Sequence, residues 1–354
     1  DPNDIVALNR FVRQSAKATT ADKVYEAYLM GLMSSGATHL GNFGSNFMTT
    51  LTRTLIERPI GVTLEAGRAI ATGTARRAFF GEVPAELVGM GRGIPDGVRA
   101  GLEALRTGVS RFRADKIEST SVVREAIKGK LGEVIRTPGR MLIAADDFFN
   151  AINQSANMNA LAYRQAVKDG KRGAEAISKR MTDILMNPTD EMIGLSRNEA
   201  LYRTFNRELG EFGNKIINLA NTKIGGTGVA PLRYVTPFLR TPMNIAKYGL
   251  ERTPLNFLRL GYKQIVGQLG DDAAEELAKP VAGTMIMFSA FEFAKAGFIT
   301  GGGPKNPAQR QALRTSGWQP YSIKLGNQYL SYGRVEPIAT VVGLAADAFE
   351  LWDN

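Results

Sequence analysis

The chain of 354 residues is long enough for one large domain or for two or three of ordinary size. Its 44 Lys and Arg against 34 Asp and Glu give a formal net charge of +10, which favours anionic partners such as nucleic acid or a membrane face. With no cysteine, and with His39 as the single histidine, the sequence excludes disulfide frameworks and thiolate metal sites and leaves almost no room for zinc sites or histidine-based acid–base pairs.

Residues 1–110 are expected to form an N-terminal helical region. The sequence begins with Asp1 and not with methionine, which indicates a processed product or a segment of a longer protein. The periodicity of apolar residues predicts helices at 4–19, 21–32, 40–57 and 62–79. The Arg58-Pro59 step is expected to end the third helix, because proline disfavours the α conformation at the residue before it. The uncharged stretch 27–52 has the length of a bilayer span, but its Gly, Ser, Thr and Asn content favours close helix packing instead.

Glycine and proline crowd residues 81–101. Within this stretch, Gly89-Met90-Gly91-Arg92-Gly93 superficially matches a phosphate-cradling loop. No alternating strand precedes the glycines and no lysine–serine pair follows them, so a nucleotide site is disfavoured. The stretch is interpreted as a helix–loop–helix corner.

Residues 111–136 are polar and basic and are interpreted as a linker or an exposed helix. Such a charge run is most often a solvated surface, but it also suits non-specific contact with the phosphates of double-stranded DNA. The candidate DNA- or phosphate-contacting residues are Arg111, Arg113, Lys116, Arg124, Lys128 and Lys130.

Residues 137–228 are expected to be a central region of long helices, the first opened by Thr137-Pro138. The predicted helices are 139–168, 174–186 and 196–224. Asp146-Asp147 is a conceivable metal-binding pair, but adjacent residues on a helix point about 100° apart. Without further ligands at helical spacing, a solvated or capping role is favoured. The sequence predicts no metal site and no cofactor.

Prolines punctuate the last region, 229–354, which is predicted to begin with short helices at 242–250 and 254–269. A helix capped by Asp271-Asp272 is expected to break at Lys279-Pro280. The apolar window 281–299 follows, and Glu292 interrupts it too early for a bilayer helix of about 20 residues. A core helix is favoured, with an interfacial or inserting helix as the alternative. The candidate membrane or oligomer contacts are Met285, Met287, Phe288, Phe291 and Phe293.

The C-terminal stretch predicts a β-hairpin followed by a helix. Two short alternating runs, 321–325 and 328–332, flank Gly326-Asn327, a dipeptide that suits a tight hairpin turn. Pro337 has no amide hydrogen and is expected to stop the second strand. A helix is predicted from Ile338 to about Leu351. The fold class is therefore mainly α, an elongated multi-helix assembly with a small C-terminal β-hairpin.

Several stretches resemble a family of phage and prophage internal virion proteins that take part in DNA ejection, of the type associated with large polyvalent proteins. The stretches that carry the resemblance are 34–59, 146–150, 236–244, 251–254 and, above all, 317–347. The resemblance implies a predominantly helical structural protein that is packaged in the capsid interior and ejected into the host cell envelope. It also implies that the copies oligomerise into part of a DNA-translocation conduit.

The partners implied are other copies of the chain, other ejection proteins or portal and core proteins of the virion, double-stranded DNA bound non-specifically, and the host inner membrane. The family offers no catalytic residues to transfer to these positions, and the chain is expected not to be an enzyme. Two alternatives remain. The first is a DNA-binding core protein that stays in the phage head, and the second is a muralytic enzyme subunit that relies on carboxylates, lysine or tyrosine.

Overall fold

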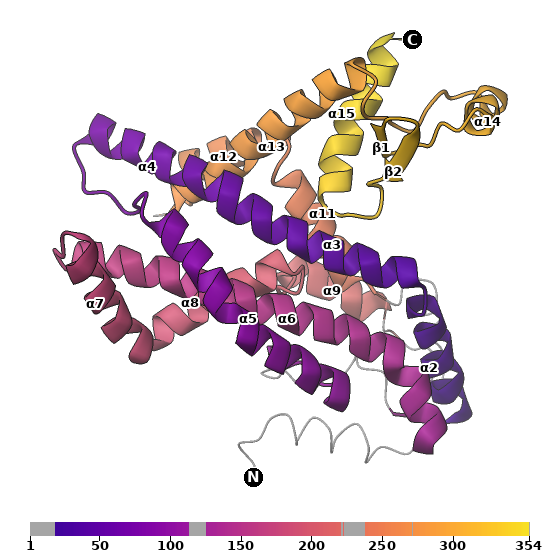
Figure 1. The fold of residues 1–354 in the computed structure, drawn as a ribbon, viewed down its shortest axis with the longest axis horizontal. Helices are drawn as coiled ribbons and strands as arrows, with labels where there is room; N and C mark the ends of the chain where they lie inside the picture. Colours follow the sequence, from indigo (N-terminus) through magenta and orange to yellow (C-terminus); the bar gives the residue numbers. More distant parts are fainter. Residues whose placement is uncertain (1–17, 113–124, 221, 223–237, 271, 354) are drawn as a thin grey trace. The chain divides into compact units, whose positions relative to one another are not determined.

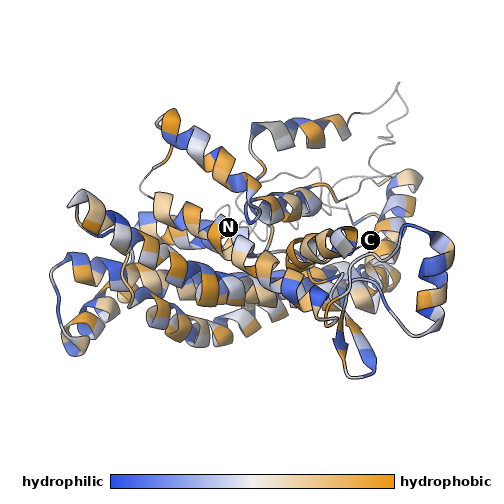
Figure 2. Cartoon of the chain, turned by 90° about the horizontal axis from the view of Figure 1, so that it is seen from above, coloured by the Kyte–Doolittle hydropathy of each residue, from blue (hydrophilic) through white to orange (hydrophobic). Residues whose placement is uncertain are grey.

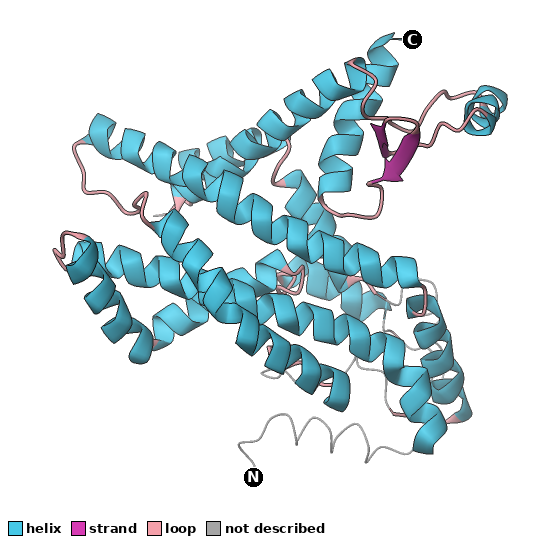
Figure 3. Cartoon of the chain, in the orientation of Figure 1, coloured by secondary structure: helices cyan, strands magenta, loops and turns pink. Residues whose placement is uncertain are grey.

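The structure of the chain is a computed structural model that describes residues 18–112, 125–220, 222, 238–270 and 272–353. It is mainly α with a small antiparallel hairpin near the C-terminus, so the predicted fold class is confirmed (Figures 1 and 3). Its elements are α2 (Thr20–Met33), α3 (Gly36–Thr52), the π-helical turn η1 (Arg53–Glu57), α4 (Arg58–Thr72), α5 (Glu82–Thr107), α6 (Gly129–Lys168), α7 (Ala174–Met186), α8 (Asp190–Arg203), α9 (Glu211–Ala220), α11 (Arg240–Leu250), α12 (Leu255–Ile265), α13 (Ala273–Lys295), α14 (Pro307–Thr315), β1 (Ser322–Leu325), β2 (Gln328–Ser331) and α15 (Ile338–Asp353). The helix predicted at 4–19 lies largely outside the described residues.

The tertiary contacts divide the chain into two compact units, each made of two separate stretches of sequence. Unit 1 comprises residues 1–46 and 84–244, and unit 2 comprises residues 47–83 and 245–354. This division follows contacts in space, whereas the four regions expected from the sequence follow composition along the chain. Those four regions therefore stay a prediction.

Helix α5 in unit 1 runs without a break over 26 residues, so the corner expected at 81–101 is wrong. Four of its glycines recur at four-residue steps and lie directly against α6. A Cβ added at Gly89 would lie 2.6 Å from the carbonyl oxygen of Ser155, and one at Gly93 would lie 2.9 Å from the Cα of Ile152. The glycines therefore allow close backbone packing of the two helices and do not form a loop. The glycines are Gly89, Gly93, Gly97 and Gly101.

Helix α6 extends over 40 residues and passes through Pro138, so the expectation that Thr137-Pro138 opens it is wrong. Its first turns are held by Arg136, whose guanidinium lies 2.9 Å from the buried carboxylate of Glu26. The same carboxylate accepts a hydrogen bond from the backbone N–H of Ile127 at 2.7 Å. These contacts with α2 hold the chain ahead of the proline in place, although proline removes one helical hydrogen bond.

The long helix predicted at 196–224 is interrupted. Helix α8 ends at Arg203 and α9 begins at Glu211, and Phe205 between them has a positive φ of 58°. The side chains of Thr204 and Asn206 in this break are buried and hydrogen-bonded to groups that include residues of α6. These two polar residues thus end the helix, because hydrogen-bond partners of their side chains lie on another element.

Two helix ends predicted at prolines in unit 2 are also wrong. The expected stop at Arg58-Pro59 is a continuous helical path in which η1 leads directly into α4. The expected break at Lys279-Pro280 lies inside α13, which continues to Lys295. Within α13, the hydroxyl of Thr284 donates to the carbonyl of Pro280 at 2.7 Å. Lys279 is buried and paired with Glu251 at 3.5 Å, so a tertiary contact holds the residue just before this proline.

The predicted hairpin is confirmed. Strands β1 and β2 are antiparallel, with Leu325 opposite Gln328, and the two residues between them form the turn. The other edge of β1 lies against the chain that follows α13, through an isolated bridge between Ile323 and Ile299. The hairpin is therefore supported on one edge by unit 2 itself, as a two-stranded sheet requires.

Gly326 at this turn has a φ of +61°, a conformation that a β-branched side chain rarely adopts. Replacing Gly326 by valine is expected to destabilise the hairpin by about 1 kcal/mol or more. Hydrogen–deuterium exchange of the β1 and β2 amides measures this loss, and a variant with unchanged protection would contradict the strained turn.

Among the described residues, no helix combines the length with the apolar composition needed to cross a bilayer.

Candidate functional site

A cluster of buried charges in unit 2 surrounds the π-helical turn η1. The guanidinium of Arg252, from the end of α11, contacts both carboxylate oxygens of Glu57, at 2.6 Å from Nε and 2.8 Å from Nη2. Arg53, one helical turn before Glu57, donates to the same carboxylate at 2.8 Å. Its second nitrogen reaches Glu275 on α13 at 2.9 Å. The cluster therefore connects three segments that are far apart in sequence.

The π-helical turn places these side chains. The backbone N–H of Arg58 bonds to the carbonyl of Arg53, a five-residue step that is wider than an α-helical turn. Pro59 follows, and a proline in an α-helix would collide with the carbonyl four residues before it. The widened turn relieves that collision and leaves Arg53 and Glu57 on the buried side of the helix.

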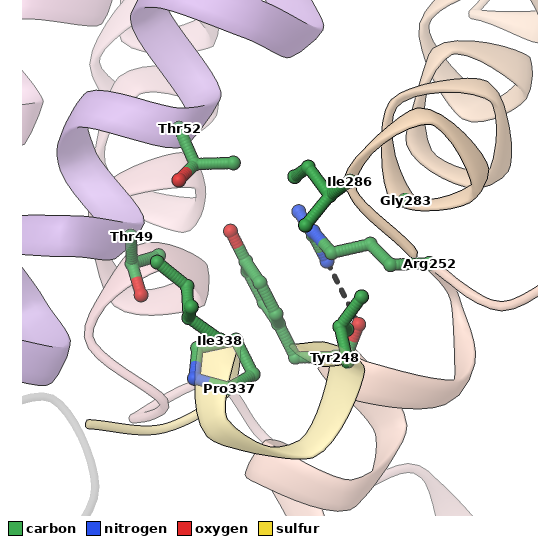
Figure 4. A pocket seen from close by; sticks show the side chains of 9 residues that line it. Thr49, Thr52, Tyr248, Arg252, Gly283, Ile286, Pro337 and Ile338 are labelled. Atoms are coloured by element: carbon green, nitrogen blue, oxygen red, sulfur yellow. Dashed lines mark hydrogen bonds between the residues drawn. The ribbon is translucent and has the colours of Figure 1, made fainter. Parts of the chain in front are cut away.

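Tyr248 lies beneath this cluster, with its ring centroid 3.1 Å from the guanidinium carbon of Arg252. The backbone carbonyl of Tyr248 accepts a hydrogen bond from the same guanidinium at 2.9 Å. A small pocket lies beside them, with the Tyr248 ring at its centre (Figure 4). Its lining residues are Thr49, Thr52, Tyr248, Arg252, Gly283, Ile286, Pro337, Ile338 and Val341.

The charge cluster is suited to holding segments together and not to proton transfer. Burial alone would raise the pKa of Glu57, but the guanidiniums of Arg252 and Arg53 outweigh burial and lower the pKa. A carboxylate held ionised, with both oxygens accepting from guanidiniums, has no proton to give at neutral pH and little basicity. Within the described ranges, no group of acidic side chains or His39 is arranged to hold a metal ion.

A second buried polar network lies in unit 1 around Asp146 of α6. One carboxylate oxygen of Asp146 accepts from the side-chain amides of Asn42 and Asn46 on α3, at 3.0 and 3.1 Å. The other accepts from Asn206 at 3.0 Å. Thr204, two residues before Asn206, donates to Asn150 one turn further along α6, at 2.8 Å. The network joins α3, α6 and the break after α8 through these hydrogen bonds.

The solvated or capping role expected for Asp146-Asp147 is wrong, because both side chains are buried. Asp147 points to a different element from Asp146 and accepts from the hydroxyl of Ser110 at 2.6 Å and from the N–H of Arg111 at 2.7 Å. The two carboxylates thus diverge, as adjacent helical residues do.

The candidate DNA-contacting residues are only partly described. Arg111, Lys128 and Lys130 are exposed, whereas Arg113, Lys116 and Arg124 lie outside the described residues. The candidate membrane or oligomer contacts on α13 divide by burial. The exposed ones are Met285, Phe288 and Phe293, and the half-buried ones are Met287 and Phe291. The contacts proposed for both sets stay predictions.

The residues of the charge cluster were not identified from the sequence. Arg53 and Glu57 are an opposite-charge pair at a four-residue step, which was a usable signal for a helical ion pair. The pairing of Glu57 with Arg252 spans 195 positions and gives no local signal. The 251–254 and 146–150 stretches, which carry the family resemblance, contribute Arg252 and Asp146 to the two buried networks.

Comparison of the chain with protein-family models, with curated proteins and with solved structures finds no match.

Proposed function

We propose that this chain is a structural phage internal virion protein that is ejected into the host envelope and oligomerises there into part of a DNA-translocation conduit. The proposal starts from the resemblance of the sequence to that family. What supports it most in the molecule is the distribution of apolar side chains, because many large ones lie on the surface while alanine fills much of the interior.

Alanine is the commonest buried apolar residue among those described. On α5 the buried apolar positions are glycines and alanines, whereas Leu87, Ile94 and Leu102 are exposed. On α13 the buried positions include Ala290 and Ala294, whereas Phe288 is 69 % exposed. Figure 2 shows apolar residues, in orange, interspersed with hydrophilic residues along the helices. Such surfaces are typical of helices that have further partners, whether other copies or an apolar phase.

Helix α12 gives the clearest example. Its exposed apolar residues recur at three- and four-residue steps, which is the stripe by which an amphipathic helix normally packs onto a core. Here the stripe faces outward, and Ile265 is 85 % exposed. Burying a leucine or isoleucine that is now in water contributes about 1.5–3 kcal/mol, so contact between copies through the stripe would be favourable. The stripe is Leu255, Leu258, Tyr262 and Ile265.

The net charge of +10 supports contact with anionic material. Packaged DNA and anionic lipid both attract a basic chain by long-range electrostatics, and added salt weakens both attractions. The alternative of a DNA-binding protein that stays in the head shares this feature.

Release of dye from anionic vesicles by the purified chain would favour the ejection protein, whereas salt-sensitive retention on DNA without dye release would favour the alternative. Turnover of peptidoglycan would contradict both.

The double variant Leu258→Asp/Ile265→Asp is expected to assemble at least tenfold less readily than the wild-type chain, because both carboxylates would have to be desolvated in the contact. Sedimentation velocity over a concentration series measures this directly. The matched control is Gln264→Asp, an exposed polar position on the same helix. If the double variant and the control assemble like the wild type, α12 is not a contact between copies.

A further inference from the structure

A loop of three glycines after α13 binds two carboxylates of α15. The N–H groups of Gly301 and Gly303 donate to the two oxygens of Glu350, each at 2.8 Å. The N–H of Gly302 donates to Asp347 at 2.7 Å, and the hydroxyl of Tyr321 donates to the other oxygen of Asp347 at 3.3 Å. We call these glycine amides and the two carboxylates the carboxylate clasp. Successive amides that converge on anionic oxygens form a strong set of charge-assisted hydrogen bonds.

The clasp depends on the absence of side chains in the loop. A Cβ on Gly301 would overlap the carboxylates of Asp347 and Glu350, and one on Gly302 would lie 2.8 Å from the hydroxyl of Tyr321. Gly303 has a φ of +81°, which favours glycine on conformational grounds alone. The loop sequence is therefore suited to holding the end of α15.

Apart from the clasp, α15 is held by apolar contacts with α13 and with the pocket around Tyr248, which Ile338 and Val341 of α15 line. The buried positions include Ala290 and Ala294 on α13, and Ala345 and Ala346 on α15. Each alanine buries much less apolar area than a leucine would, so this contact is weaker per residue than a leucine-lined one. A ring contact between Phe291 and Phe349, with centroids 5.7 Å apart, adds to it. The clasp therefore adds charge-assisted hydrogen bonds to this apolar packing.

The chain before α15 provides a pivot. Tyr332 is buried, and its hydroxyl donates to the carbonyl of Thr300 at 2.8 Å, so the hairpin stays attached to the loop after α13. The residues between Tyr332 and Ile338 connect this anchor to α15. Such a linker spans roughly 17 Å when extended, at about 3.3–3.6 Å per residue. That reach allows α15 to leave its own α13 while the rest of unit 2 keeps its fold.

We propose that copies of this chain assemble by exchanging α15, so that α15 of one copy lies on α13 of a second copy and its carboxylates bind the second copy's glycine loop. The inference rests on the proposed homo-oligomer and adds a second contact between copies to the one proposed for the α12 stripe. The face of α13 and the helix α15 already fit each other within one chain, and exchange of an identical element uses the same contacts between copies. If each copy donates α15 to one neighbour and accepts it from another, the contact is head-to-tail, and it forms a ring where the rotation between copies closes.

Mixing two single-cysteine variants tests the exchange, because the natural chain has no cysteine. One variant carries Phe291→Cys and the other Phe349→Cys, and a short thiol cross-linker is added under conditions in which the wild-type chain assembles. The exchange predicts a covalent dimer that contains one chain of each kind. A chain that carries both cysteines is the control for contact within one copy. Mixing Phe291→Cys with Leu313→Cys, an exposed position on α14, gives the background from random collision.

A second pair, Ile286→Cys with Val341→Cys, keeps the test valid if loss of the rings impairs folding, since both residues line the same pocket. Oligomers that form without the mixed cross-link in either pair would overturn the exchange and leave the proposed function intact. A chain that stays monomeric under all conditions would overturn both.

The variant Asp347→Asn/Glu350→Gln is expected to form the mixed cross-link at least several-fold faster, because the clasp must open first. Glu292→Gln, an exposed carboxylate on α13, is its control, and equal rates in the two variants would remove the clasp from the proposal.

Discussion

Replacing Glu57 by glutamine is expected to lower the free energy of unfolding of unit 2 by about 3–5 kcal/mol. The substitution leaves the guanidiniums of Arg252 and Arg53 buried, with only 3 % and 4 % of their side chains exposed, and removes the charge that both of them contact. The loss arises from the uncompensated buried charge and not from a large net benefit of the original pair. The same change at an exposed ion pair would cost little.

Chemical denaturation followed by tryptophan fluorescence measures this effect in the right part of the molecule, because both tryptophans, Trp318 and Trp352, belong to unit 2. Glu292→Gln is the matched control, since its partner Lys295 lies 3.8 Å away at an exposed site. The control is expected to change the free energy of unfolding by less than about 0.5 kcal/mol. A Glu57→Gln variant that unfolds at the same denaturant concentration as its control would show that the charge cluster does not hold unit 2 together.

Replacing Gly89 by alanine is expected to destabilise unit 1 by about 1–3 kcal/mol, the usual cost of extra volume in a well-packed contact. The added Cβ would lie less than 3 Å from backbone atoms of Ser155 and Ala156 on α6, which cannot move aside as a flexible side chain can. Ser155 would also be displaced from its hydrogen bond to the carbonyl of Gly89, now 2.8 Å long. The gain in helix propensity from alanine offsets only part of this cost.

Gly91→Ala on the same helix is the control, because a Cβ at Gly91 has no neighbour within 4 Å. This variant is expected to gain about 0.5–1 kcal/mol from the reduced backbone entropy of the unfolded chain. Thermal unfolding followed by circular dichroism, with hydrogen exchange of the α5 and α6 amides, separates the two variants. Stabilisation by both alanines would mean that α5 does not pack through its glycines.

The hairpin was predictable because its signals are local. Gly326-Asn327 provides the turn, and alternating residues on both sides provide the strands, so no distant contact was needed to place them. Helix α7 was predicted at the bounds observed, because Asn187-Pro188 ends it.

Glycine and proline were misinterpreted wherever tertiary contacts compensated for them. Pro59 follows a π-helical turn, and Pro138 and Pro280 lie within helices stabilised by buried ion pairs on neighbouring residues. The glycines of α5 were interpreted as a corner, although their four-residue spacing was itself a helical signal for close packing. Rules based on local sequence treat each of these residues as a helix breaker. Contacts with a neighbouring helix decide whether the helix ends there.

The buried networks were less predictable than the elements that carry them. Asp146 was singled out, but its partners Asn42, Asn46 and Asn206 come from stretches 60–104 positions away. The carboxylate clasp likewise joins Gly301 to Glu350 across 49 positions. A polar residue that is buried on a helix needs a hydrogen-bond partner. The sequence alone does not say where that partner lies.

Electron microscopy of the purified chain, incubated with vesicles that contain anionic lipid, tests the central claim most directly. That claim is that copies of the chain build a conduit. The expected result is closed rings or tubes with a lumen, attached to the membrane and formed by the wild-type chain but not by Leu258→Asp/Ile265→Asp. Single copies in every image, on and off the vesicles, would contradict it.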